Sequence, residues 1–586
     1  MSSGRTSRAA SWPCTGRWRS GSAMTFVLDA YAARSCPLKT VNSFTPHLVT
    51  PSLERPDPPF FRDSAAIEAA VFGALLAGPG RIEDLRPLRH APRASAEQAC
   101  LAALASGADV VIGGLLPLDE ENHRTGRPSL LVRSPEGGYH PVHVKFHRVL
   151  ESASPDAPPL LVSRLDAPAS VVGLPGRRFR WGTRLNAALQ VAHYWRLLEA
   201  TGYAAQEPWA GLVGVDQLNL DPEARPAKVE QVITWLDLSE EVVAPNPRTL
   251  ERPGDADPLS TLARYDAEHR YRIELAEAAL ASAGQDTLLT PIMSSECRGC
   301  VWQEHCQAQL DADDLSLRIT KTPLDVHEVR TLRHLGISTV AELARADLDE
   351  LLAAYLPRAS HRIGGEQRLR RAHRRAQLMH SGVELERQTQ GPLDLPRHDL
   401  EIDVDIETSA DDRVYLWGFW VDDPARGEPY GRQFAAFTDL DDAAEADLAA
   451  RALGWLQQVV AGRDAAVYHY SDYEVIRLHK LAPRLGAVGG WAQEWASDHF
   501  VDLFGVVREN FFGANGLGLK VVTAAVTGFA WRDEDPGGLN SQTWFADAVG
   551  DPDEGVRERA RGRVLEYNED DVRATWHLRR WLRDQG

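Results

Sequence analysis

Long apolar runs are absent from this sequence: no uncharged apolar stretch reaches the roughly 18 residues that a bilayer-spanning helix needs. The first 24 residues are basic and polar without an apolar core, so they are neither a signal peptide nor a membrane anchor. We expect residues 1–24 to be a disordered tail or an over-extended start. Hydrophobic residues make up 44% and charged residues 25%, as in ordinary soluble proteins, so a soluble chain is expected.

Cysteine is also scarce, with six in 586 residues. Three of the six stand in one short segment, CRGCVWQEHC, rather than being spread along the chain. Such a distribution suits a metal site in a reducing compartment better than a disulfide framework. We therefore expect a cytoplasmic protein.

Positive charge is in short supply, because 64 Lys and Arg residues face 83 Asp and Glu residues and the net charge is −19. Binding of phosphates is largely electrostatic, so this balance at first argues against a nucleic-acid partner. The segment RLRRAHRR nevertheless gathers five arginines on one predicted helix: Arg368, Arg370, Arg371, Arg374 and Arg375. Many acids could also be ligands for cations that screen substrate charge. A solvated charged helix face is the alternative for the arginine segment.

The length of the chain predicts about three or four domains. Residues 25–310 alternate helical patterns such as AAIEAAVFGALLAG with strand-like runs such as DVVIGGLL, an α/β pattern. Residues 311–395 are helical, and two short amphipathic stretches broken at Gly336 resemble a helix-hairpin-helix, whose turn amides can hold a phosphate. A plain helical connector explains that pattern equally well. Residues 396–586 alternate strands and helices again, so the fold class is α/β and multidomain.

Two acids stand two residues apart in the strand-like segment LEIDVDIET. Alternation along a strand points Asp405 and Glu407 from the same face. Two carboxylates on one face of a buried strand repel each other, and a hard cation such as Mg²⁺ or Mn²⁺ relieves that cost. In YNEDDV, Tyr567 precedes Asp571 by one helical turn, so the phenol and the carboxylate share a side. The tyrosine could orient an attacking water, and a solvated surface position is the alternative for each residue.

Further acids lie between and beside these motifs. The segment AAVYHYSDYEVIRL ends a predicted strand and opens a helix, supplying Asp472 and Glu474, and FVDLFGVV supplies Asp502. We expect Asp403 and Asp570 to be neighbours rather than ligands, because strand alternation or helical phase turns each of them away.

The order of these acids resembles the DEDD superfamily of 3′-to-5′ exonucleases, in particular the YprB-type RNase H-like domain, over roughly residues 400–584. The resemblance implies that Asp405 and Glu407 form the first metal-binding motif and that Tyr567 and Asp571 form the third. It also implies two Mg²⁺ or Mn²⁺ ions about 4 Å apart, one activating water and the other stabilising the leaving 3′ oxygen.

The second motif departs from the family pattern. Many relatives have an asparagine followed four residues later by an aspartate, whereas this chain has Tyr470 and Glu474. The resemblance implies that Glu474 is the acid of this motif. Asp472 and Asp502 stay open as alternative ligands.

The cysteine segment sets Cys297, Cys300 and Cys306 in a C-x₂-C-x₅-C pattern typical of metal ligands. A fourth ligand is needed, and Cys36 is the best candidate, because it would join the beginning of the domain to its end. Four thiolates suit either Zn²⁺ or an iron-sulfur cluster. The pattern resembles the iron-sulfur staple of AddB-type and CRISPR-associated RecB-like nucleases, which implies a [4Fe-4S] cluster, with Zn²⁺ as the alternative. Cys100, on an apolar helix, is expected to be a buried thiol.

The chain between the two arms of this cysteine set resembles the RecB-like (PD-(D/E)xK) nuclease, which has a restriction-endonuclease-type α/β fold. The resemblance rests on Glu68 on an early helix, on strands near residues 129 and 143, on Lys145 and on the segment QVAHY. In that segment Gln190 and Tyr194 match the Q-x-x-x-Y motif, which implies that both bind nucleic acid.

Both acids of the RecB-like motif are missing. Ser129 stands where the family has an aspartate, and His143 precedes Lys145 where the family has D/E-x-K. A hydroxyl and an imidazole are poor ligands for Mg²⁺, so we expect a vestigial site that serves to bind a strand. Compensation by Glu68, or a softer metal held by His143, stays open.

We therefore expect a metal-dependent nuclease whose C-terminal domain removes nucleotides from the 3′ ends of DNA or RNA. Single strands are the expected substrate, and DNA repair is the expected setting. No Walker A segment is present, so a helicase motor would be a separate partner. The alternatives are a non-catalytic nucleic-acid-binding scaffold with both nuclease folds degenerate, and a zinc-stapled interaction protein. The acids Asp405, Glu407 and Asp571 argue against the scaffold.

Overall fold

The computed structural model of the chain describes residues 15–20, 23–51, 59–220, 229–246, 256–282 and 288–585. The chain forms two compact units. The first comprises Met1–Ala312, Asp325–Leu335 and Ala353–Gly365, and the second comprises Asp313–Leu324, Gly336–Leu352 and Glu366–Gly586. Among the described residues, no helix combines the length and the apolar character that crossing a membrane requires.

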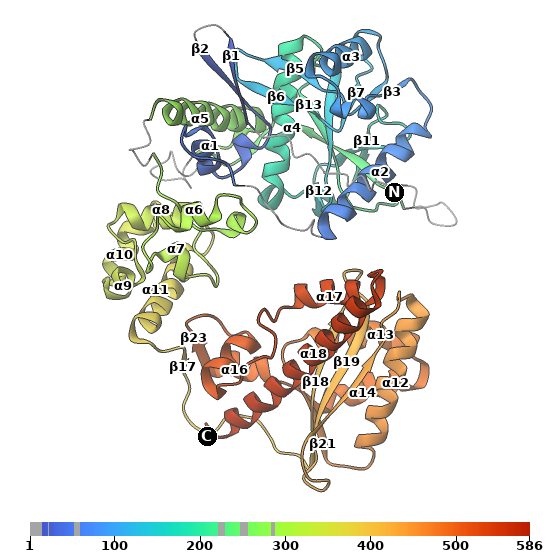
Figure 1. Ribbon diagram of the computed structural model, residues 1–586, viewed down its shortest axis with the longest axis vertical. Coiled ribbons are helices and arrows are strands. Elements are labelled where there is room, and N and C mark those ends of the chain that lie inside the picture. The colour runs from blue at the N-terminus through green and yellow to red at the C-terminus, as the bar shows by residue number, and fades with distance from the viewer. Residues whose placement is uncertain are drawn as a thin grey trace. The chain divides into compact units, whose positions relative to one another are not determined.

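The first unit (Figure 1) is built around a mixed eight-stranded sheet with the order β11-β10-β14-β13-β8-β7-β4-β3. A smaller four-stranded sheet has the order β1-β2-β6-β5. The strands of the unit are β1 (Thr15–Ser20), β2 (Ala23–Leu28), β3 (Ile82–Asp84), β4 (Val110–Ile112), β5 (Leu116–Asp119), β6 (Arg124–Gly126), β7 (Leu130–Arg133), β8 (Tyr139–Val144), β9 (Leu150–Ser152), β10 (Leu160–Arg164), β11 (Val172–Leu174), β12 (Arg177–Phe179), β13 (Trp209–Val213), β14 (Val232–Asp237), β15 (Glu241–Val243) and β16 (Leu259–Ser260).

The helices of the first unit are α1 (Pro37–Phe44), α2 (Pro59–Leu76), α3 (Arg93–Ala105), α4 (Trp181–Thr201), α5 (Thr261–Ala281), α6 (Gln303–Gln307) and α8 (Val326–His334). Helix α4 is buried along most of its second half, and its apolar residues join the core formed with β13 and β14. Because α4 packs directly on β8, the polar residues of these two elements meet inside the unit.

The N-terminal segment differs from expectation. Residues 1–14, with Cys14 and most of the expected disordered tail, lie outside the described residues. Strand β1, however, begins at Thr15 and pairs antiparallel with β2, so regular structure precedes Met24.

The expected helical middle contributes to both units. Its helices are α7 (Leu315–Arg318), α8, α9 (Val340–Arg345), α10 (Leu348–Tyr355) and α11 (Gly365–Ser381). The break expected at Gly336 is present, since this residue has a left-handed φ of 82° between α8 and α9, which favours glycine. The amides of Ser338 and Thr339 already donate to the side chain of Glu342, at 2.8 and 2.9 Å. A phosphate role for this turn stays a prediction.

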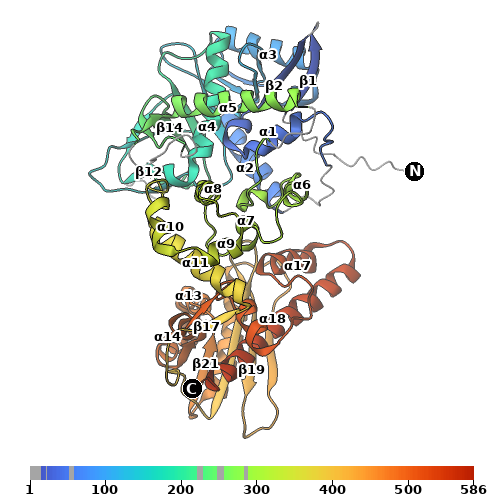
Figure 2. The ribbon, with the colours of Figure 1, turned by 90° about the vertical axis from the view of Figure 1, so that its left-hand side faces the viewer.

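The second unit contains a five-stranded sheet with the order β20-β19-β18-β21-β22 (Figure 2). The strands of the whole unit are β17 (Leu385–Arg387), β18 (Leu400–Thr408), β19 (Val414–Asp422), β20 (Tyr430–Ala435), β21 (Ala465–His469), β22 (Phe500–Asp502) and β23 (Phe511–Gly513). Its later helices are α12 (Asp442–Val460), α13 (Tyr473–Leu481), α14 (Gly486–His499), α15 (Leu503–Asn510), α16 (Leu519–Thr527), α17 (Gly538–Gly550) and α18 (Glu554–Arg583). Strand β18 is central, antiparallel to β19 and parallel to β21.

The alternation of LEIDVDIET decides how the two faces of this sheet are covered. The even-numbered apolar residues of β18, from Leu400 to Ile406, pack in one core with α12 and α14. The odd-numbered acids face the long helix α18, which crosses the other side of the sheet. Helix α18 begins where the side chain of Asp553 accepts hydrogen bonds from the amides of Gly555 and Val556. The strand and the helix together bring distant acids to one place.

Candidate metal centre

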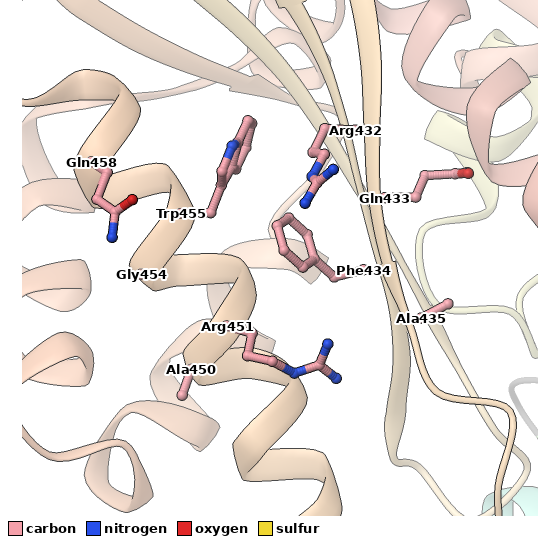
Figure 3. A pocket seen from close by; sticks show the side chains of 9 residues that line it. All are labelled: Arg432, Gln433, Phe434, Ala435, Ala450, Arg451, Gly454, Trp455 and Gln458. Carbon is pink, nitrogen blue, oxygen red and sulfur yellow. The ribbon is translucent and has the colours of Figure 1, made fainter.

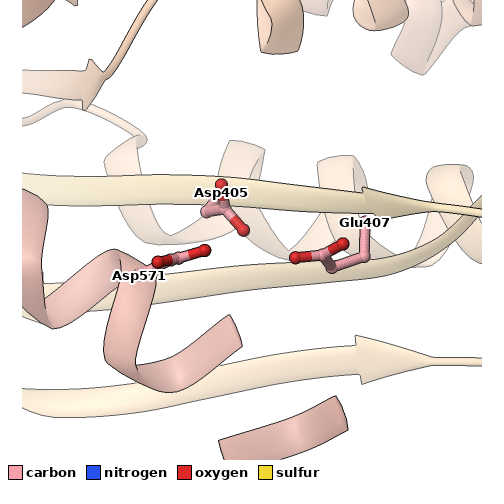
Figure 4. Close-up of side chains that lie close together, drawn as sticks. All are labelled: Asp405, Glu407 and Asp571. Carbon is pink, nitrogen blue, oxygen red and sulfur yellow. The ribbon is translucent and has the colours of Figure 1, made fainter. Parts of the chain in front are cut away.

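Three carboxylates from two elements converge on one face of the five-stranded sheet (Figure 4). Asp405 and Glu407 project from β18 and Asp571 projects from α18, and one oxygen of each lies within 4.8 Å of the others. Strand alternation and helical phase therefore placed these acids as the sequence predicts. Among the described residues, no other group of three acidic, histidine or cysteine ligands is this close.

Two uncharged side chains hold the strand acids. Asn568 Nδ2 donates to Asp405 Oδ2 at 2.8 Å, and Ser541 Oγ of α17 donates to Glu407 Oε2 at 2.6 Å. Each bond fixes one oxygen of a carboxylate, so the other oxygen of each is left for a cation.

The third acid is held by two stronger donors. Lys520 Nζ and Trp531 Nε1 each donate to Asp571 Oδ1 at 2.7 Å. Lys520 Nζ also donates to the hydroxyl of Tyr567 at 3.2 Å. Tyr567 and Asp571 therefore share one side of α18 and one partner, as their spacing predicts.

The charge of this group is costly as it stands. Burial, with repulsion from Asp571 and Glu407, raises the pKa of Asp405 well above its ordinary value. Burial, with repulsion from Asp571, raises the pKa of Glu407 to about 8. A divalent cation held by the remaining oxygens would offset both the burial of these carboxylates and the repulsion between them. Carboxylate oxygens are the ligands that Mg²⁺ and Mn²⁺ prefer. The residues present fit such a cation.

Glu474 lies beside this group but outside its closest set. It stands in the first turn of α13 and is buried, and its Oε2 is a buried oxygen without a hydrogen bond among the described residues. Burial and the neighbouring charge of Asp405 raise the pKa of Glu474 well above its ordinary value. A buried carboxylate oxygen with no donor is suited to a cation or to a water bound to one. Glu474 therefore stays the candidate for the second motif.

The two alternatives to Glu474 are an exposed aspartate and an aspartate that caps a helix. Asp472 is exposed at the start of α13. Asp502 caps α15, because its Oδ1 accepts from the amides of Phe504 at 2.9 Å and Ser471 at 3.0 Å. The second bond helps to hold Ser471 at a left-handed φ of 97° just before α13.

The prediction that strand alternation turns Asp403 away from the metal-binding acids was wrong. Asp403 shares the face of Asp405 and Glu407, because residues two apart on a strand point the same way. It stays out of the metal group because Arg579 of α18, fully buried, donates to both of its oxygens, at 3.1 and 2.8 Å. Asp570 is likewise neutralised by Arg532, whose Nε donates to it at 2.9 Å. Paired arginines, and not alternation, separate the strand's structural acid from its metal-binding acids.

Four supporting residues were missed at the sequence level: Asn568, Ser541, Lys520 and Trp531. One signal was available for the first. Gly418 interrupts the apolar strand β19, and a Cβ there would lie 1.9 Å from the side chain of Asn568. A glycine inside a strand often marks such a close approach. The other three come from separate helices and loops and left no pattern.

The expected RecB-like residues meet in the first unit as a closed polar group. Lys145 Nζ donates to Gln190 Oε1, and Gln190 Nε2 lies 3.1 Å from both His143 Nε2 and the hydroxyl of Tyr194. The Nδ1 of His143 lies 3.0 Å from Ser129 Oγ. Gln190 and Tyr194 are buried, so their side chains do not face a nucleic-acid strand at the surface, as the resemblance implied.

This polar group contains no carboxylate. Burial lowers the pKa of Lys145 to about 7, and burial, with the charge of Lys145, keeps the pKa of His143 well below its ordinary value. Glu68 has Arg89 and Arg86 as its charged neighbours. The group therefore lacks the anionic oxygens that Mg²⁺ requires.

The four cysteines named from the sequence lie together. Cys36, Cys297, Cys300 and Cys306 line one small cavity. Glu296 joins the two arms, because its Oε1 accepts from the amide of Cys36 at 2.9 Å and from Lys39 at 2.7 Å. Burial raises the pKa of the Cys306 thiol to about 11. Bound iron or zinc would keep such a thiol deprotonated. Cys100 is fully buried, as predicted.

The arginines of α11 are largely used within the unit. Arg374 pairs with Glu386, Arg370 pairs with Glu366 at 2.9 Å, and Arg375 donates to the carbonyl of Lys321. This supports the interpretation of a charged helix face over a dedicated binding patch.

An open hollow of about 670 Å³ lies on the other face of the sheet (Figure 3). Arg432, Gln433 and Phe434 of β20 and Trp455 of α12 are among the residues that line it, and the side chain of Gln433 points away from it. Gln433 Nε2 instead reaches Asn568 Oδ1 at 3.1 Å on the carboxylate side. The hollow is thus separated from the acids by the sheet and is not the metal centre.

Comparison with known proteins identifies the fold of the C-terminal domain. Residues 403–583 match the family described as the RNase H superfamily. The chain has no match among curated proteins or solved structures. The C-terminal domain is RNase H-like, which indicates a nuclease-type function on nucleic acid, and RNase H-like nucleases usually use Mg²⁺ or Mn²⁺.

Proposed function

We propose that the chain is a metal-dependent 3′-to-5′ exonuclease whose reaction takes place at Asp405, Glu407 and Asp571. The observation that carries this proposal is the convergence of these three carboxylates within an RNase H-like domain. The raised pKa values of Asp405 and Glu407, together with the buried Glu474 oxygen that accepts no hydrogen bond among the described residues, support a site built for positive charge. Exonuclease polarity is inferred from the resemblance to the DEDD superfamily.

The chain's own residues would divide the work as follows. Asp405, Glu407 and Asp571 would hold Mg²⁺ or Mn²⁺, with Glu474 beside them. The bound metal supplies Lewis-acid activation of water and stabilises charge at the phosphate. Tyr567, whose pKa is raised by burial, keeps its proton, so its hydroxyl can orient a water by hydrogen bonding.

For the first unit we propose a RecB-like domain that is impaired in catalysis and contributes to strand binding. The closed group around His143 and Lys145 supports this, because it contains no acid. We further propose a [4Fe-4S] cluster on Cys36, Cys297, Cys300 and Cys306, supported by the one cavity that the four side chains line and by the spacing of the cysteine segment. A role in cytoplasmic DNA repair, with a separate helicase, completes the proposal.

The central test uses end-labelled single strands of DNA and RNA with Mg²⁺ or Mn²⁺. Asp405→Ala should abolish degradation, and Lys145→Ala should barely change it. Labels at the 5′ and 3′ ends report polarity, since a 3′-to-5′ enzyme shortens a 5′-labelled strand step by step. The reverse pattern for the two variants would overturn the assignment of roles.

The cysteine proposal has an independent test in the colour of the protein. An iron-sulfur protein is brown and absorbs at about 400 nm, whereas a zinc protein is colourless. Cys300→Ser should bleach the absorbance. A colourless wild-type protein containing zinc would favour the structural alternative.

A non-catalytic nucleic-acid-binding scaffold is the second candidate. It predicts that strands bind with equal affinity to the wild-type protein and to Asp405→Ala and that neither degrades them.

A further inference from the structure

The RNase H-like centre contains a cation of its own. The Nζ atom of Lys520 is 2.7 Å from Asp571 Oδ1 and 3.2 Å from the hydroxyl of Tyr567. It also lies 5.0 Å from the ring centroid of Trp531 and 4.8 Å from that of Tyr567, within the range of cation–π attraction. Four contacts therefore hold one ammonium group, whose side chain is 32% exposed.

The local structure does not by itself favour a lysine there. Lys520 is the second residue of α16, and the positive end of a helix dipole disfavours a cation in the first turn. The chain also uses lysine sparingly, for six of its 64 basic residues, so arginine is its default base. A lysine offers a compact point charge where an arginine would offer a wide planar fork. The carboxylate side of the contact must therefore stabilise Lys520.

The contacts of Lys520 determine which oxygen of Asp571 is available. Together with Trp531 Nε1, also at 2.7 Å, Lys520 gives Oδ1 two donors. That leaves Oδ2 as the oxygen for a metal ion. The same ammonium holds the phenol oxygen of Tyr567, so one side chain fixes both a metal ligand and the residue proposed to orient water.

We infer that Lys520 is a positioning residue of the metal centre. It is a fixed cation that holds Asp571 and Tyr567 in place and partly neutralises the carboxylates. The inference rests on the proposed nuclease function for its effect on turnover. Its effect on metal binding is independent of that function.

Removing the charge should move metal binding and turnover in opposite directions. A positive charge beside the carboxylates repels a divalent cation, so the neutral Lys520→Met should bind the cation more tightly. Trp531 continues to hold Asp571 Oδ1 in this variant, and the methionine keeps an apolar stem against the rings. The hydroxyl of Tyr567 loses the donor that fixes its oxygen, so turnover should fall. A lysine that only supported the fold would weaken both properties when replaced.

The experiment measures Mn²⁺ binding by electron paramagnetic resonance and degradation of end-labelled strands on the same full-length preparations. We expect Lys520→Met to bind Mn²⁺ roughly tenfold more tightly and to turn over about 100-fold more slowly. Lys520→Arg should keep the wild-type Mn²⁺ affinity and recover part of the turnover. Asp405→Ala supplies the background of Mn²⁺ bound elsewhere.

A matched control is Lys480→Met. Lys480 lies in the same unit, is 58% exposed and pairs with Asp412 outside the centre, so both readouts should stay at wild-type values. Weaker Mn²⁺ binding or undiminished turnover in Lys520→Met would overturn the inference. If the wild-type protein degrades no strand while Lys520→Met still binds Mn²⁺ more tightly, the nuclease proposal fails and the fixed cation is supported.

Discussion

The two units present the same local geometry with opposite chemistry. In the second unit, Asp405 and Glu407 of β18 face Tyr567 and Asp571, one turn apart on α18. In the first unit, His143 of β8, followed two residues later by Lys145, faces Gln190 and Tyr194, one turn apart on α4. Each centre sets residues two apart, on a strand or directly after it, against residues four apart on a helix.

The difference lies in how each set of side chains is satisfied. The group around His143 closes on itself through hydrogen bonds between uncharged or weakly charged partners. Burial, with repulsion from the neighbouring carboxylates, raises the pKa values of Asp405 and Glu407, so this centre needs a cation from outside. A shared geometry therefore does not imply a shared function, since the charge of the residues decides whether the site requires a metal.

The largest effect should come from removing a ligand in only one centre. Glu407→Gln keeps the size and the hydrogen bond to Ser541 but removes the charge, so degradation should fall by about 1000-fold or more. Gln190→Ala, the corresponding change in the first unit, should leave the rate within about threefold. Single-turnover degradation of a labelled strand measures both. Equal losses would show that the two centres act together.

Restoring the missing acids should give the first unit a metal site of its own. Ser129→Asp combined with His143→Glu would place two carboxylates beside Lys145, as the RecB-like pattern requires. In an Asp405→Ala background, Mn²⁺ binding should rise from background to about one ion per chain, because the new acids supply oxygen ligands. Isothermal titration would measure the stoichiometry. No added ion would mean that the first unit is closed to metals for reasons beyond its missing acids.

The metal should stabilise the second unit in a pH-dependent way. The pKa of Glu407 in the folded protein is raised to about 8, so the folded state holds this proton more tightly than the unfolded chain does. Without metal, the stability of the fold therefore falls as the pH rises from the pKa of an unfolded glutamate toward 8. Mg²⁺ should therefore raise the melting temperature by about 5 °C at pH 8.5 and by less at pH 6. Asp405→Asn should melt higher than the wild type without metal and lose the shift. Differential scanning calorimetry follows both, and an equal shift at the two pH values would contradict the repulsion argument.

The smallest effect concerns the lysine of the first unit. Burial lowers the pKa of Lys145 to about 7, so the folded state binds fewer protons than the unfolded state. The free-energy cost of burying Lys145 is full below pH 7. It disappears as the pH approaches the pKa that lysine has in the unfolded chain. Lys145→Met should thus add about 1 kcal/mol of stability at pH 6 and less at pH 9. Urea unfolding at the two pH values measures this, and a variant that loses stability at pH 6 would show that the bond to Gln190 outweighs the burial cost.

Local pattern was sufficient to predict several parts of the site. Alternation in LEIDVDIET placed Asp405 and Glu407 on one face, and helical spacing placed Tyr567 beside Asp571. The spacing of the cysteine segment likewise predicted the side chains that meet Cys36. The side chains lie near one another because strand and helix periodicity are set by backbone geometry, and their roles as ligands stay predictions.

The chain's sequence therefore determined which faces the acids occupy and which acids are present in each unit. Only the tertiary structure decided that Arg579 neutralises Asp403, that Lys520 holds Asp571, and that Gln190 is buried. The physical reason is that periodicity orients a side chain on its own element, whereas its charge balance depends on partners that arrive from distant elements by packing.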